Sequence, residues 1–145
     1  MVAIKNLINT DSVWVAYPAV EDESFEFELK FATKDKIQKM QKAATTMKWR
    51  KNQQVEEYSD DKFMEAFIKA CVVNWRGLTV EKLQDMIPVD LSDISEEELS
   101  ESVEFSVEQL LDLIDNDTTN LAEWLVTQSR NIENFTKSNS ANVSE

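Results

Sequence analysis

The stretch DDKFMEAFIKACVVNWRG, residues 60–77, constrains this chain most, because it has the pattern of an amphipathic helix with both ends marked. Ser59 and Asp60 can accept hydrogen bonds from the free backbone N–H groups of a first helical turn. Gly77, the only glycine of the chain, follows where a helix often ends in a residue with positive φ. We therefore expect a helix over residues 60–76, with Gly77 as its structural stop. Apolar residues four apart would lie on one face of that helix: Phe63, Phe67 and the structural Cys71.

Two β-rich stretches precede this helix and predict an N-terminal hairpin over residues 13–31. The first, VWVAY, is rich in β-branched and aromatic residues and ends at Pro18. The second, FEFELKF, alternates strictly between apolar and charged residues, which is typical of a strand with one buried face. Because a two-stranded hairpin is marginal alone, this face must pack on helices or on another subunit. Its apolar members are Phe25, Phe27, Leu29 and Phe31.

The remaining patterns are mostly helical. Apolar spacing and cap residues at Thr33, Thr79 and Ser106 predict helices at about 33–48, 79–87, 106–114 and 118–136, in addition to 60–76. Residues 49–58 are expected to form a loop between helices. Ser95 and Glu98 can form a capping box inside an acidic, serine-rich stretch, 88–105, which is interpreted as a mobile connector. Residues 1–12 are expected to be a loose lead-in, and residues 137–145 a disordered tail. We predict an α+β fold, mostly α, in one domain at 13–136: an N-terminal β-hairpin followed by four to five helices.

Charge is distributed unevenly along the chain. The net charge is −13, yet residues 30–51 carry eight bases and one acid. The acidic majority argues against general nucleic-acid binding, because phosphate contacts need a positive surface. The basic segment, with Phe31 and Trp49 beside it, leaves three interpretations open. The three are a solvated lysine face, a nucleic-acid site that uses stacking, and a docking surface complementary to the acidic half of another subunit.

Composition also bears on the compartment. Apolar residues make up 42% of the 145 residues, which favours folding over disorder. There is no apolar run long enough to predict a membrane span, and the first residues lack the pattern of a secretory signal. A single cysteine cannot form an internal disulfide. We expect a cytoplasmic protein that does not bind membranes.

The residue types that catalysis and metal binding need are scarce. The chain has no histidine, which removes the commonest general base and a common metal ligand. Its one cysteine lies on an apolar helix face, and one glycine cannot build a phosphate-binding loop. Acidic runs such as Asp60–Asp61 and 96–98 lack the spacing of a metal site. We therefore expect no enzymatic activity, no catalytic residues, no metal and no cofactor.

Three features together resemble the tail assembly chaperones of long-tailed, siphovirus-type bacteriophages. The first is FELKFATKDKIQKMQKAAT, an extended segment followed by a lysine-rich helix. The second is VVNWRGLT, residues 72–79, at the end of a long helix. Its pattern is an aliphatic pair, a polar residue, Trp, any residue, Gly and an aliphatic residue. The third is FSVEQLLDLIDNDTTNLAEWLVTQSRNIENF, with paired leucines and then a Trp-aliphatic pair. The resemblance covers residues 13–136, but the acidic connector 88–105 departs from the family pattern.

The resemblance implies a non-catalytic protein that binds the tape measure protein, keeps it soluble and helps to recruit subunits of the tail-tube protein. Such proteins act in the host cytoplasm and are absent from the mature virion. In many of them a ribosomal frameshift also yields a longer product. A groove rimmed by negative charge would cover apolar helix surface of the partner. The candidates for its partner-binding residues are Trp75, Trp124, Phe135, Phe67 and Trp49.

Other functions also fit the sequence. An acidic mimic of DNA that inhibits a nucleic-acid-binding enzyme would use the net charge of −13, although the basic residues 30–51 interrupt a continuous negative face. A small structural or connector protein of the virion would share the size and the binding role. The opposite charges of the two parts of the chain also predict a possible homo-oligomer with head-to-tail contacts.

Overall fold

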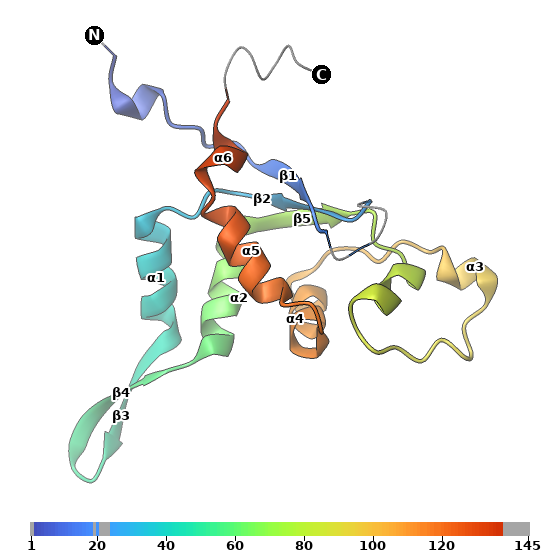
Figure 1. The fold of residues 1–145 in the computed structure, drawn as a ribbon. Coiled ribbons are helices and arrows are strands. Elements are labelled where there is room, and N and C mark those ends of the chain that lie inside the picture. Colours follow the sequence, from blue (N-terminus) through green and yellow to red (C-terminus); the bar gives the residue numbers. More distant parts are fainter. Residues whose placement is uncertain (1, 19, 21–23, 138–145) are drawn as a thin grey trace.

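A three-stranded antiparallel sheet forms the centre of the protein (Figure 1). The computed structural model describes residues 2–18, 20 and 24–137. The predicted tail, 137–145, lies outside the described residues except for Lys137. The strands of this sheet, in their spatial order, are β1 (Val13–Ala16), β2 (Glu26–Leu29) and β5 (Val72–Arg76). Strands β1 and β2 are antiparallel neighbours, with Val15 opposite Phe27, so the predicted pairing within 13–31 is confirmed.

Figure 1 shows helices on one side of this sheet, with α1 and α2 leading down toward a second, two-stranded sheet. The predicted caps are confirmed, because the hydroxyls of Thr33, Ser59 and Ser106 each accept a hydrogen bond from a first-turn N–H group. The predicted capping box of Ser95 with Glu98 is also present. Among the described residues the α-helices are α1 (Lys34–Ala44), α2 (Asp60–Cys71), α3 (Glu96–Leu99), α4 (Val107–Asn116), α5 (Leu121–Ser129) and α6 (Ile132–Phe135), and 3-10 turns occur at Ile4–Asn6 and Glu81–Asp85.

The core lies between the inner face of β2 and the helices. Phe25, Phe27 and Leu29 are fully buried, as the alternating pattern predicts. The outer face of the same sheet is polar, and there the Arg76 guanidinium lies 4.0 Å from the centroid of the Trp14 ring and bonds Glu26 at 2.7 Å. One face of the sheet is therefore dry and the other is wet.

The predicted order of an N-terminal hairpin followed by helices is wrong, because strands recur along the chain. The helix expected at 60–76 ends at Cys71, and residues 72–76 form β5, which pairs with β2. Val72 and Val73 are β-branched and therefore favour a strand. The spacing of four from Cys71 to Trp75 continues the helical pattern only by coincidence.

A second error concerns residues 45–58, which form a hairpin of β3 (Thr45–Arg50) and β4 (Gln53–Tyr58). The helix expected at 33–48 stops at Ala44, and the loop expected at 49–58 is mostly strand. The turn between the strands has Lys51 and Asn52 where hairpin turns usually carry glycine, so the usual sequence signal is missing.

The C-terminal half also differs in detail from the prediction. The helix expected at 79–87 is a 3-10 turn, and the helix expected at 118–136 is divided into α5 and α6. Asn131 causes this division, since its side chain accepts a hydrogen bond from the Glu133 N–H and so caps a new helix. The connector 88–105 is joined to the body at its end, where the Val103 N–H donates to the Leu78 carbonyl at 2.8 Å.

The lead-in is tied to the C-terminal helix. The Asn9 side chain donates to the Phe135 carbonyl at 2.7 Å, and Lys137 lies 2.7 Å from a carboxylate oxygen of Asp11. This carboxylate has a lowered pKa because Lys137 bonds it and attracts its charge. The chain therefore begins its path across the sheet from a position next to α6 (Figure 1).

Gly77 has the positive φ that its sequence position predicts, but it ends a strand and not a helix. Its φ is +82°, and a Cβ atom built there would lie 1.9 Å from the Ser24 carbonyl oxygen. That distance is far inside van der Waals contact with backbone that cannot move aside easily. Glycine is therefore required both for the backbone angle and for the close approach of β5 to residue 24.

We predict that Gly77→Ala lowers the free energy of unfolding by about 2–4 kcal/mol, because it adds a backbone clash to an unfavourable φ. Thermal or urea unfolding followed by circular dichroism would measure this. Asn120→Gly is the matched control, since Asn120 also has a positive φ, 58°, and its side chain makes no cap bond. Equal stability of Gly77→Ala and the wild type would contradict the close approach.

Candidate functional site

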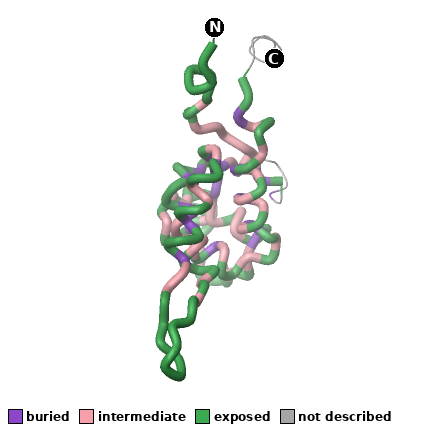
Figure 2. Tube along the Cα trace, turned by 90° about the vertical axis from the view of Figure 1, so that its left-hand side faces the viewer, coloured by how far each residue is buried: buried purple, intermediate pink, exposed green. Residues whose placement is uncertain are grey.

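The β3–β4 hairpin projects from the body of the protein (Figures 1 and 2). It continues directly from α1 and leads directly into α2, and the Ser59 N–H closes its base by donating to the Ala44 carbonyl at 2.9 Å. Lys51 and Asn52 form a two-residue turn with φ of 50° and 64°, which matches the twist of the flanking strands. Two packed helices therefore hold an otherwise marginal hairpin in a defined direction.

One face of this hairpin carries exposed apolar side chains. Trp49 is 72% exposed, and Met47 and Tyr58 are each 52% exposed. The register places them together, because Tyr58 lies opposite Thr45, which shares a face with Met47 and Trp49. We call Met47, Trp49 and Tyr58 the apolar face. Large side chains grouped in this way on a projecting element indicate a surface that contacts another molecule.

The opposite face of the hairpin is ionic. Glu57 lies 3.1 Å from Arg50 and 3.4 Å from Lys48. The hydrogen bond from Arg50, together with the charge of Lys48, holds the pKa of the Glu57 carboxyl below its ordinary value. Because these groups are exposed, the ion pairs add little stability. This face also carries Val55, which is 39% exposed, while Glu56 lies opposite Met47 on the other face, so the two faces differ in degree.

The structure places four of the five aromatic candidates in or against the core. Trp75 is 4% exposed and Phe67 is fully buried. Phe135 is buried with its ring centroid 5.4 Å from that of Phe31. Trp124 is half-buried, 4.8 Å from the ring centroid of Tyr17. Their aromatic surface is used for packing in this conformation, and they do not form an open groove.

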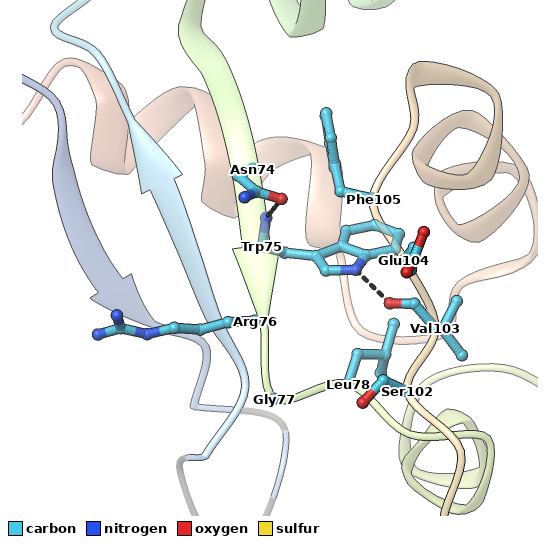
Figure 3. A pocket seen from close by; sticks show the side chains of 9 residues that line it. All are labelled: Asn74, Trp75, Arg76, Gly77, Leu78, Ser102, Val103, Glu104 and Phe105. Carbon is cyan, nitrogen blue, oxygen red and sulfur yellow. Dashed lines mark hydrogen bonds between the residues drawn. The ribbon is translucent and has the colours of Figure 1, made fainter.

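Trp75 joins the sheet to the segment at 102–105. Its Nε1 donates to the Val103 carbonyl at 2.7 Å, and Figure 3 shows the indole reaching across from β5 toward this segment. Its ring centroid lies 5.8 Å from that of Phe25 and 5.2 Å from that of Phe105. The bond satisfies the polar end of a side chain whose ring is otherwise buried.

Trp49 is the one candidate that lies exposed. Sequence reasoning missed its companions Met47 and Tyr58, because residues 45–58 showed no recognised hairpin turn. The alternation of Thr45, Met47 and Trp49 with charged or polar neighbours is a signal that could have identified this face.

Cys71 is fully buried and free. Burial raises the pKa of its thiol, and the charges of Lys36 and Lys30 oppose this only in part. At neutral pH the sulfur is therefore protonated and unreactive, which suits a structural role and not a nucleophile.

Within the described part of the chain, no three His, Cys, Asp or Glu side chains lie close enough together to hold a metal ion. In that same part, every helix is too short or too polar to cross a membrane. Compared with known protein families, with curated proteins and with solved structures, the chain shows no match.

We predict that Trp75→Ala lowers the free energy of unfolding by about 3–5 kcal/mol, because it empties a buried aromatic site. Trp49→Ala is the matched control and should change it by no more than about 0.5 kcal/mol, since that ring is exposed. Urea unfolding of both variants would measure the difference. A wild-type midpoint for Trp75→Ala would contradict the burial of this side chain.

Proposed function

We propose that the chain is a non-catalytic binding protein and that it acts as a phage tail assembly chaperone. Its client is the tape measure protein, which it keeps soluble in the host cytoplasm until tail-tube subunits assemble around it. The observation that carries the binding role is the projecting hairpin with its exposed apolar face. The resemblance of residues 13–136 to tail assembly chaperones supports the particular role.

The chemistry of the apolar face suits a long helical client. Trp49 and Tyr58 combine large apolar area with few rotatable bonds, so little entropy is lost when they become buried. Met47 is flexible and adapts to irregular surfaces, which favours binding at many sites along one client. A narrow hairpin reaches apolar side chains on a helical partner without interference from the body of the protein.

The net charge of the chain supports the same role. A chaperone bound in several copies to one client must keep neighbouring complexes apart. With 28 acidic and 15 basic residues, each copy has a net charge of −13, which repels other complexes. Covering apolar client surface and adding negative charge would both oppose aggregation.

The test is co-expression of the chain with the long helical protein encoded near it, followed by assay of the soluble fraction. We predict that the wild type holds the client in solution and co-purifies with it. Met47→Gln with Trp49→Gln should leave most of the client insoluble, because the apolar face is lost. Lys48→Gln with Val55→Gln is the matched control on the opposite face and should behave as the wild type.

Each outcome has a distinct meaning. A client that precipitates with the wild type would overturn the chaperone role. If the client stays soluble with the Met47→Gln, Trp49→Gln variant, the client contact does not lie on the hairpin. Detection of the chain in purified particles would favour a structural protein of the virion instead.

A further inference from the structure

The free edge of β5 lies beside a groove. Among the described strands, β5 pairs with β2 on one side and with none on the other. On its other side, residues 78–80 bond to residues 101–103, through the Val103 N–H to the Leu78 carbonyl and the Val80 N–H to the Glu101 carbonyl. From there the two segments separate around a cavity of about 450 Å³, lined by residues 74–78 and 102–105 (Figure 3).

In the part of the chain that the structure describes, no neighbouring strand pairs with the edge of β5 at this groove. The Trp75 N–H, which points to the free edge, donates to the side-chain oxygen of Asn74 at 2.9 Å. A local side chain therefore takes the place of a strand partner there. Such an edge is a template for an added extended chain, which would gain main-chain hydrogen bonds in the direction of the sheet.

The negative charge around the groove favours an added strand of one kind, a basic one. Glu104 is exposed and lines the groove, and Glu101 is exposed one residue before the lining segment 102–105. They belong to the segment 81–117, which carries thirteen acids and one base. Among the described residues, none of these thirteen carboxylates has an ion-pair partner. An added strand with basic side chains would therefore be favoured over a neutral or an acidic one.

The chain itself contains a strand of this kind. Strand β3 carries Lys48 and Arg50 and leads into Lys51, and residues 34–51 together hold seven bases and one acid. Among residues 2–18, 20 and 24–137, the sheet of β3 and β4 has two strands, so the outer edge of β3 is unpaired there. The hairpin points away from the sheet of its own copy (Figures 1 and 2), so its edge is presented to another molecule.

We propose that β3 of one copy adds to the free edge of β5 in a second copy, beside the acidic segment 81–117. Each copy offers one hairpin and one groove, so the contact is head to tail and generates a ring or a filament. This inference rests on the proposed function in treating the hairpin as a protein-contact element. The edge of β3 makes the contact between copies, and the apolar face remains free for the client.

Sedimentation velocity of the full chain without any client tests self-association. In about 0.1 M NaCl we expect species larger than a monomer that grow with protein concentration. In about 1 M NaCl the apparent dissociation constant should rise about ten-fold or more, because the screening length falls from about 10 Å to about 3 Å. A chain that stays monomeric at every concentration in low salt would overturn the inference.

Complementary variants test the head-to-tail geometry. Lys48→Glu with Lys51→Glu changes the hairpin edge, and Glu101→Lys with Glu104→Lys changes the rim of the groove. Each variant alone should be monomeric. A mixture of the two should associate again, because the intact hairpin of one variant meets the intact groove of the other and the reversed charges of the two altered surfaces are also complementary.

Matched controls change the same number of charges elsewhere. Lys5→Glu with Lys62→Glu and Glu123→Lys with Glu133→Lys alter exposed residues outside both surfaces, and both controls should associate as the wild type does. Circular dichroism of every variant would show that it is folded. Association that persists in both interface variants, or a mixture of the two that stays monomeric, would overturn the head-to-tail contact.

The two proposals fail separately. A monomeric chain that still keeps the client soluble would remove only the self-association. A chain that associates but leaves the client insoluble would remove only the chaperone role.

Discussion

The ring of Phe27 lies where the sheet and the helices meet. Its centroid is 6.1 Å from the ring of Tyr17, 6.0 Å from that of Trp75 and 5.9 Å from that of Trp124. These three partners come from the end of β1, from β5 and from α5, so one buried side chain joins segments far apart in the sequence. Aromatic contacts of this kind add about 0.5–1.5 kcal/mol each beyond the area they bury. The position of β5 depends on this cluster, and the helix–strand boundary at Cys71 depends on β5.

The same residue types serve opposite purposes in two parts of the molecule. In the sheet, Trp75 and Phe27 are buried and hold the body together. In the hairpin, Trp49 stands with Met47 and Tyr58 on an exposed face and stabilises little. Because Trp75 is already committed to packing and to its bond with Val103, the hairpin becomes the surface on which binding is proposed. The groove beside β5 is proposed for an added strand because the Trp75 N–H bonds the Asn74 side chain and no strand of the described chain.

Particular residues explain which sequence predictions succeed. The alternation from Phe25 to Phe31 predicts the inner face of β2 because its period of two has no helical counterpart. The hydroxyls at Thr33, Ser59 and Ser106 predict helix starts because a cap acts over three residues and needs no distant partner. The sequence predicts a helix at residues 72–76 because the spacing of four from Cys71 to Trp75 fits a helix. The β-branched valines of the same stretch favour a strand, so the local pattern does not decide between the two. The candidate site was found only through Trp49, since the Lys51–Asn52 turn carries no glycine to mark it.

The sequence by itself determined the local features of this protein: the cap positions, the buried face of β2, the buried cysteine and the polarity of charge along the chain. Each depends on residues within a few positions of one another. Tertiary structure alone decided that residues 72–76 are a strand, that Gly77 lies against residue 24, and that Trp75 is packed while Trp49 is exposed. Those outcomes depend on hydrogen bonds and contacts to segments up to about fifty residues away, whose free energy outweighs the weak local preferences of the residues concerned.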